Sequence, residues 1–249
     1  MCGIIGIASN KPVSNNIINS LKKLEYRGYD SAGLATLNEN FISEKKCSGR
    51  VEELEKILFK NPSDGNLGIG HVRWATHGVA NKVNAHPHSS EIVSVVHNGI
   101  IENSEKLKKE LELRGAKFKS QTDTEVITLL ITEELKKNEP LEAVHKTLKR
   151  LNGSFALGII FKNHQNIIIG ARRGSPLAVG FSKNENYLGS DSYALKSMTN
   201  KISYLDDGDL CLLTKDNIEF YDLNKKKINK KIYILSDDEK NNDKGDYKN

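Results

Sequence analysis

Cysteine is the second residue of this chain, and that position can give it two reactive groups. If Met1 is removed, which the small side chain of Cys2 permits, the thiol and a free α-amine share one Cα atom. An α-amine titrates near pH ~7.7–8.0 in short peptides, so part of it is neutral at cellular pH and can accept a proton. Cys2 would then be nucleophile and base in one residue. The alternative is that Cys2 is only a small apolar residue beside a strand.

Two charged residues further along the chain could bind a free amino acid. Arg73 offers a planar guanidinium that can hold a carboxylate through two hydrogen bonds. Asp123 could accept hydrogen bonds from an ammonium group. Together they would suit the head group of an amino acid. The alternative for Asp123 is structural, because with Thr122 it could cap the helix that follows.

The dipeptide Asn98-Gly99 follows a dense β-branched run and has two interpretations. A side-chain amide next to a glycine N–H could stabilise the oxyanion that develops when a thiol attacks an amide carbonyl. Asn-Gly is also a strong signal for a hairpin turn. From these two residues alone, the turn is the default interpretation.

Five of the seven histidines lie between residues 71 and 97, which raises the question of a metal site. They are His71, His77, His86, His88 and His97. None of them pairs at i, i+4 on an expected helix and no cysteine joins them, which argues against zinc. Trp74, the only tryptophan, is core filler by default, and it attracts attention because it follows Arg73 directly.

Hydrophobic periodicity and turn residues predict the elements that must position these side chains. Helices are expected at 13–25, 51–60, 103–114, from 122 onward, 140–151 and 192–199. Strands are expected at Ile4–Ile7, 33–38, 41–47, 67–74, 92–96, 154–161, 166–172, 177–181, 187–190, 202–205, 209–214 and 217–223. Strands in runs and helices in runs, without regular βαβ alternation, predict an α+β domain with antiparallel sheets.

Composition narrows the class of protein. The 249 residues are 37% hydrophobic and 28% charged, which is typical of a globular protein of one or at most two domains. No apolar run approaches the ~20 residues of a membrane helix, and no secretory signal is evident, so we expect a cytoplasmic protein. The net charge of +5 owes much to lysines at 225–231 that have no interleaved aromatic residues, so nucleic-acid binding is not expected.

The chain has two cysteines besides Cys2. Cys211 is expected in the core, and Cys47 has no visible partner.

Longer motifs connect the candidate residues to a known family. The opening MCGIIGI resembles that of the class II glutamine amidotransferases, a family of N-terminal-nucleophile hydrolases. Within it, other motifs are similar to those of the amino-sugar-forming branch: LEYRGYDSAG (24–33), GIGHVRWATHG (68–78), NAHPH (84–88), VHNGIIEN (96–103), QTDTEV (121–126), GSPLAVG (174–180) and Ser190-Asp191. The similarity covers essentially residues 2–235.

The resemblance implies a fold and a role for each matching residue. The implied fold is a four-layer αββα sandwich of two antiparallel sheets, and the implied reaction is glutamine hydrolysis through a Cys2 thioester, without cofactor or metal. Asn98 and Gly99 would form the oxyanion hole, and Arg27 would orient the nucleophile. The implied substrate-binding residues are Arg73, Trp74, Thr76, His77, Gly78, His86 and Asp123. Among these, Trp74 would close the pocket and gate ammonia transfer, and His86 would form part of the wall.

The resemblance also predicts a second region. Members of that branch continue into a sugar-isomerising region that combines ammonia with fructose 6-phosphate, and the full enzyme is expected to be a homo-oligomer. We therefore expect residues 2–235 to be the glutaminase domain and the polar residues 236–249 to resemble the start of a linker to that region. Other functions stay open: an amidase for a different amide, the glutaminase half of another class II amidotransferase, or a non-catalytic partner of an isomerase subunit.

Overall fold

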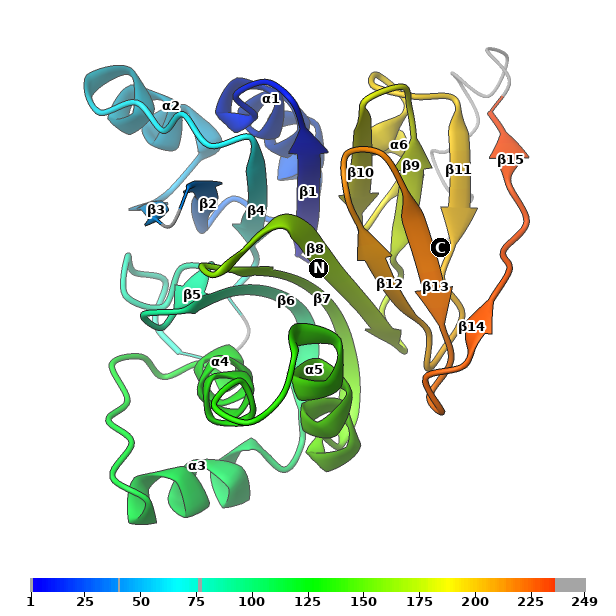
Figure 1. The fold of residues 1–249 in the computed structure, drawn as a ribbon. Helices are drawn as coiled ribbons and strands as arrows, with labels where there is room; N and C mark the ends of the chain where they lie inside the picture. Colours follow the sequence, from blue (N-terminus) through cyan, green and yellow to red (C-terminus); the bar gives the residue numbers. More distant parts are fainter. Residues whose placement is uncertain (1, 40, 76–77, 236–249) are drawn as a thin grey trace, which may run out of the picture.

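The computed structural model describes residues 2–39, 41–75 and 78–235 (Figure 1). The expected polar tail, 236–249, lies outside these ranges, as do Thr76 and His77. Within the described ranges, no helix combines the length and the apolar character needed to cross a membrane.

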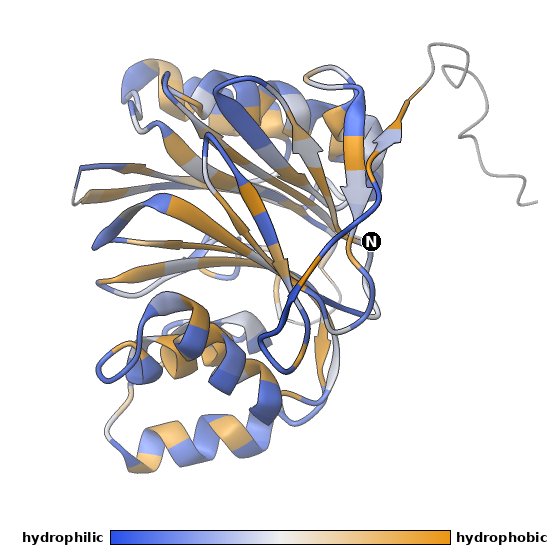
Figure 2. Ribbon diagram, turned by 45° about the vertical axis from the view of Figure 1, so that its right-hand side comes forward, coloured by the Kyte–Doolittle hydropathy of each residue, from blue (hydrophilic) through white to orange (hydrophobic). Residues whose placement is uncertain are grey.

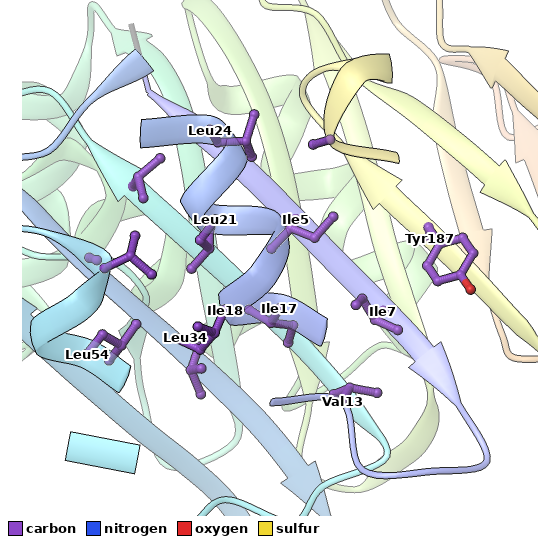
Figure 3. Packing of buried hydrophobic residues seen from close by; sticks show 14 of the residues in the cluster. Ile5, Ile7, Val13, Ile17, Ile18, Leu21, Leu24, Leu34, Leu54 and Tyr187 are labelled. Carbon is purple, nitrogen blue, oxygen red and sulfur yellow. The ribbon is translucent and has the colours of Figure 1, made fainter. Parts of the chain in front are cut away.

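The first strand, β1 (Gly3–Ser9), is buried on both faces. Its Ile5 and Ile7 pack under helix α1 (Ser14–Leu24), as Figure 3 shows. Its Ile4 points the other way and packs between the two sheets. A strand covered on both sides needs a continuous apolar run, and the opening of the chain provides one.

The strand β1 lies inside an eight-stranded sheet of the described chain, in which every neighbouring pair is antiparallel. The order is β15-β11-β9-β10-β1-β4-β2-β3. The bounds of the other strands are β2 (Ser31–Asn38), β3 (Phe41–Ser48), β4 (Leu67–Arg73), β9 (Ala178–Phe181), β10 (Glu185–Gly189), β11 (Lys201–Tyr204) and β15 (Tyr233–Ile234). Because Gly3 pairs with Val72, the start of β1 meets the end of β4.

A second antiparallel sheet has seven strands in the order β14-β13-β12-β8-β7-β6-β5. They are β5 (His88–Ser89), β6 (Val93–Ile101), β7 (Gly153–Phe161), β8 (His164–Arg173), β12 (Leu210–Leu213), β13 (Ile218–Tyr221) and β14 (Lys227–Ile228). The longest of these strands, β6, β7 and β8, lie side by side (Figure 1).

Helices cover the outer face of each sheet, so the chain has four layers (Figure 2). The first sheet packs against α1, α2 (Val51–Lys60) and α6 (Ser192–Leu195), and the second packs against α3 (Ser104–Leu113), α4 (Asp123–Glu134) and α5 (Pro140–Arg150). A third apolar cluster fills the space between the sheets and includes Cys211. The expected αββα sandwich of two antiparallel sheets is confirmed, and so is the core position of Cys211.

The structure contradicts the turn expected at Asn98-Gly99. Strand β6 continues to Ile101, so both residues lie inside a strand and not in a hairpin. Gly99 pairs with Phe155 and has a φ of 134°, and a Cβ at this position would lie 2.1 Å from the carbonyl oxygen of Ser154. Glycine is required here by backbone conformation and close approach within the sheet, and not by a turn.

Smaller differences concern the C-terminal half. Helix α6 ends at Leu195 and not at 199. The short strands β14 and β15 form at positions where the sequence predicted no strand. Cys47 is buried beside Ala32, and its thiol donates to the Ala32 carbonyl at 3.6 Å.

Four histidines form a buried group beside the apolar layers. His71 lies on β4, His88 on β5 and His97 on β6, and His86 precedes β5. The rings of His71 and His86 are 4.3 Å apart, and those of His86 and His88 are 4.9 Å apart. Burial lowers the pKa of His71 and of His88 to about 3, and it lowers the pKa of His86 well below its usual value. These three rings are therefore neutral near pH 7.

We predict that this group makes the fold sensitive to acid. Below pH ~6.5 the unfolded chain binds protons on His71 and His88 that the folded chain does not accept until about pH 3, so stability falls as the pH falls through this window. Each histidine contributes a slope of about 1.4 kcal/mol per pH unit. Urea unfolding between pH 7 and 4 measures this slope.

The variant His88→Gln should make the slope shallower by about one proton. Cys211→Ala is the matched control, because it also removes a buried side chain but one whose pKa burial raises to about 12. It should lower stability equally at every pH in the window. An unchanged slope in His88→Gln would contradict the prediction.

Candidate active site

The pairing of β1 with β4 brings Cys2 to the residues that follow β4. Its Sγ lies 3.3 Å from the backbone nitrogen of Trp74, which donates to it, and 3.7 Å from the carbonyl oxygen of Trp74. Burial raises the pKa of the Cys2 thiol, and the Trp74 backbone contact and the charge of Arg73 offset this only in part. The thiol is therefore protonated at neutral pH and needs a base before it can attack.

Asn98, on strand β6 of the second sheet, contacts Cys2. Its Nδ2 donates to the backbone carbonyl of Cys2 at 3.0 Å. Gly99 follows it on β6 and lines the same cavity as Cys2. Strand β6 of the second sheet thus brings the Asn98 side-chain amide to Cys2 and places Gly99 at the same cavity.

A small cavity gathers most of the candidate residues. Its volume is about 40 Å³, and it is lined by Cys2, Arg73, Trp74, His86, His97, Gly99, Thr122, Asp123 and Thr124. A groove of about 740 Å³ opens elsewhere, between β3 and Lys162, but it contains neither the thiol nor Arg73. The smaller cavity is therefore the candidate site, because it contains these reactive side chains and the larger groove does not.

The cavity contains both signs of charge. Arg73 is 4% exposed; burial lowers the pKa of its guanidinium, while Cys2, Asp30 and Asp123 act to raise it. Asp123 is the first residue of α4, and its Oδ2 accepts from the backbone nitrogen of Ile101 at 2.8 Å. The residue at the N-cap is Thr122, whose side chain makes no capping hydrogen bond. The alternative in which Thr122 and Asp123 cap the helix is therefore not supported, and the Asp123 carboxylate faces β6 and the cavity.

Other predicted residues occupy different places. Trp74 lines the cavity, is 45% exposed and makes an edge contact with Tyr29, with ring centres 5.8 Å apart. His86 lines the wall, and its Nε2 lies 2.6 Å from Thr124 Oγ1. Gly78 is exposed and does not line the cavity. Thr76 and His77 lie outside the described residues.

Arg27 does not line the cavity. Its guanidinium forms a salt bridge with Asp191 at 2.7 Å, and the Tyr26 hydroxyl also bonds that carboxylate. The adjacent Ser190 accepts from the backbone nitrogen of Ile4 through its Oγ at 2.9 Å. Arg27 is therefore linked to the start of β1 through Asp191 and Ser190, and not to the thiol directly.

The lack of a side chain at Gly28 allows the segment that contains Arg27 to pack against the backbone of Trp74. A Cβ on Gly28 would be 2.6 Å from the backbone nitrogen of Trp74. Two residues on, Asp30 accepts from the backbone nitrogen of Ala75 through its Oδ2 at 2.8 Å. The turn after Arg27 thus holds the backbone that contacts the Cys2 thiol.

Sequence reasoning missed several residues of the cavity. Thr124 bonds two rings, since its Oγ1 lies 2.6 Å from His86 Nε2 and 3.0 Å from His97 Nδ1. Thr122 Oγ1 lies 2.8 Å from His88 Nε2. In the sequence, the clustering of histidines between 71 and 97 was the signal that could have pointed to these contacts. In the structure, the histidines that contact the threonines form a hydrogen-bonded wall beside the cavity. Among the residues that the structure describes, no three or more His, Cys, Asp or Glu side chains are arranged so that they could hold a metal ion.

Similarity to known proteins covers most of this chain. The family described as "Glutamine amidotransferase domain" matches residues 71–197. The glutamine–fructose-6-phosphate aminotransferase (isomerizing) of Mesorhizobium japonicum is 50% identical over 93% of the chain, and that of Zymomonas mobilis is 45% identical over all of it. The chain spans only 38% and 41% of these two relatives.

Solved structures share the fold. A Bacillus subtilis glutamine phosphoribosylpyrophosphate amidotransferase, complexed with ADP and GMP, matches with a TM-score of 0.75 at 24% identity, over 89% of this chain and 49% of that one. A glutamine aminotransferase class-II domain protein from Silicibacter pomeroyi matches with a TM-score of 0.63 at 16% identity, over 89% of this chain and 99% of that one.

The family match spans half of the chain, the fold agrees with that of solved amidotransferases, and the matched range contains every residue that lines the cavity except Cys2. We conclude that the chain belongs to the glutamine amidotransferase domain family, in its class II form with the N-terminal-nucleophile hydrolase fold.

Proposed function

We propose that this chain hydrolyses the side-chain amide of L-glutamine at Cys2 and releases glutamate and ammonia. The observation that carries this proposal is a single cavity lined by a thiol, a buried guanidinium and a carboxylate, namely Cys2, Arg73 and Asp123. Free amino acids carry the two head-group charges that such a pair binds. Family membership supports the same reaction.

The proposed reaction begins with proton transfer from the thiol. Because burial raises the pKa of the Cys2 thiol, its α-amine accepts the proton as the sulfur attacks the amide carbon. A C–S bond forms, and the carbonyl oxygen becomes an oxyanion. Collapse of this intermediate breaks the C–N bond, and the ammonium group of Cys2 returns its proton to the departing amide nitrogen, which leaves as ammonia. Water then attacks the thioester, which releases glutamate and restores the thiol.

Asn98 and Gly99 are proposed to stabilise the oxyanion. The Nδ2 of Asn98 carries two hydrogens, and only one is needed for the Cys2 carbonyl at 3.0 Å. The other is available to the oxyanion, together with the backbone N–H of Gly99. Donors held in place by a strand need no reorganisation during the reaction, which is the source of their catalytic effect.

Arg73 and Asp123 are proposed to bind the carboxylate and the ammonium group of glutamine. The Thr76-His77-Gly78 segment would assist, and His86 would support the cavity wall through Thr124. Arg27 acts at a distance in this proposal, because its salt bridge with Asp191 fixes the start of β1.

A cavity of about 40 Å³ holds about one water molecule, so glutamine must widen it. The half-exposed Trp74 is the side chain best placed to move and then close the pocket.

The full reaction of the curated relatives is a further part of the proposal. We propose that residues 2–235 are the glutaminase part of a glutamine–fructose-6-phosphate aminotransferase and that residues 236–249 lead toward a sugar-isomerising region. That region would use the ammonia to form glucosamine 6-phosphate for amino sugar synthesis. The identity of 45–50% to enzymes of that name supports this assignment.

The first prediction concerns Cys2 and Met1. Active protein should lack Met1, because a peptide bond at the Cys2 nitrogen removes the base. Intact-mass measurement gives the N-terminus, and glutamate release gives the activity. Cys2→Ala should abolish release, whereas Cys47→Ala, the control at another buried thiol, should retain it. Full activity in a sample that retains Met1 would contradict the mechanism. Equal activity of Cys2→Ala and wild type would instead indicate a different nucleophile.

The second prediction separates substrate binding from folding at Asp123. Asp123→Asn keeps an oxygen that can accept from the Ile101 backbone but loses the negative charge. The KM for glutamine should rise by about 30-fold or more, equivalent to about 2–5 kcal/mol, with little change in melting temperature. The matched control is Glu125→Gln on the same helical turn, whose carboxylate accepts from the backbone nitrogens of Lys119 and Ser120. Glu125→Gln should lower the melting temperature and leave KM within about threefold. The reverse pattern would assign Asp123 a structural role.

The third prediction concerns the fate of ammonia. With glutamine and fructose 6-phosphate, the 249-residue polypeptide alone should yield glutamate and ammonia in equal amounts and no glucosamine 6-phosphate. Chromatographic assay of amino sugar, with a full-length relative as positive control, tests this. Amino sugar formed by the polypeptide alone would place a second active site within these residues.

A further inference from the structure

His71 is fully buried and has no part in the proposed mechanism so far. It lies on β4 between two strands, since its backbone pairs with Ile4 of β1 and with Gly33 of β2. Its ring reaches the second sheet, where Nε2 lies 3.0 Å from the carbonyl oxygen of His97 and 3.0 Å from Oδ1 of Asn98.

These two contacts determine which ring nitrogen carries the proton. A backbone carbonyl can only accept a hydrogen bond, so the Nε2 of His71 must be the donor to His97. The same N–H therefore faces the side chain of Asn98. The opposite ring nitrogen, Nδ1, has no hydrogen-bond partner among the described residues, which suits an unprotonated nitrogen. Burial lowers the pKa of His71 to about 3, so this neutral tautomer persists at physiological pH.

The orientation of the Asn98 amide follows from its two neighbours. An amide oxygen and an amide nitrogen have nearly the same shape, so their assignment depends on the hydrogen-bond network. At one end, His71 donates and requires the oxygen. At the other end, the Cys2 carbonyl at 3.0 Å accepts and requires the nitrogen. Both contacts select the same orientation, with Nδ2 toward the nucleophile.

We propose that His71 is a positioning residue, whose Nε2–H holds the Asn98 side-chain amide with its nitrogen toward the site where the oxyanion forms. This proposal rests on the proposed glutaminase function of Cys2. A rotation of the amide by half a turn would present Oδ1 to the Cys2 carbonyl and to the developing oxyanion, and both contacts would be repulsive. Among the described residues, His71 is the hydrogen-bond donor to Asn98 Oδ1, so its loss would leave that rotation unopposed at the oxygen end of the amide.

The test uses two substitutions that differ in one property. His71→Gln places an amide nitrogen close to the position of Nε2 and can donate to both oxygens, whereas His71→Leu fills the space without a donor. His145→Leu is the control for loss of a buried imidazole, because His145 bonds the Leu223 carbonyl from α5, away from the cavity. Steady-state glutamate release by the whole chain, melting temperature and the side-chain amide NMR signals of Asn98 are measured for each variant.

We expect His71→Leu to lower kcat by about 10–100-fold, a part of the ~10²–10³-fold loss typical when an oxyanion donor is removed. The KM should stay within about threefold, since the substrate head group is bound elsewhere. His71→Gln should restore most of kcat, and His145→Leu should lower the melting temperature without lowering kcat. In an Asn98→Ala background, His71→Leu should cause no further loss, because its effect passes through the missing amide.

Equal losses of kcat in His71→Gln and His71→Leu, or an additive loss in the Asn98→Ala background, would overturn the proposal. Absence of turnover in wild type would refute the glutaminase function, and it would leave the positioning role to the NMR measurement. In the NMR measurement, the Asn98 amide hydrogens should exchange slowly with solvent in wild type and His71→Gln, and faster in His71→Leu. Identical exchange in all three proteins would overturn the role of His71 independently of activity.

Discussion

The hydrogen bond from the Asn98 amide to the Cys2 carbonyl joins the two sheets at the candidate site, and the rest of the site depends on that junction. The proposed nucleophile belongs to the first sheet and the proposed oxyanion donors belong to the second. Neither sheet alone contains both sets of proposed reacting groups. The apolar cluster between the sheets would therefore matter for the proposed reaction, because it fixes the distance between Cys2 and β6.

The sequence predicted most of the elements because their signals were local. The burial of β1 on both faces follows from its continuous isoleucines, and α2 begins and ends where its periodicity does. The site was less predictable, because Asn98-Gly99 carries a strong local turn signal. Pairing with β7 overrides that signal and keeps Gly99 in a strand. The family resemblance pointed to a role for these two residues other than a turn, whereas local chemistry favoured a hairpin, which the structure does not contain.

The contacts behind indirect roles could not be predicted from the sequence. The family resemblance pointed to Arg27 as an orienting residue, but not to its link to β1 through Ser190 and Asp191, the latter 164 positions away in the chain. Thr124 bonds two histidines because the start of α4 lies over β6, a contact that no spacing reveals. The roles of such residues become apparent only when the fold brings distant segments together.

The buried imidazoles lower the stability of the fold in acid, since a neutral ring in an apolar layer resists protonation.

Burial of the Cys2 thiol has a consequence for its chemical durability. Peroxides and alkylating agents react with the thiolate and hardly at all with the thiol. Because burial raises the pKa of Cys2, the resting protein holds the sulfur in its unreactive form. In the proposed mechanism, activation depends on a base on the same residue and on a bound amide that the sulfur can attack. A thiol held in this way would stay unreactive toward oxidants until the proposed substrate occupies the cavity.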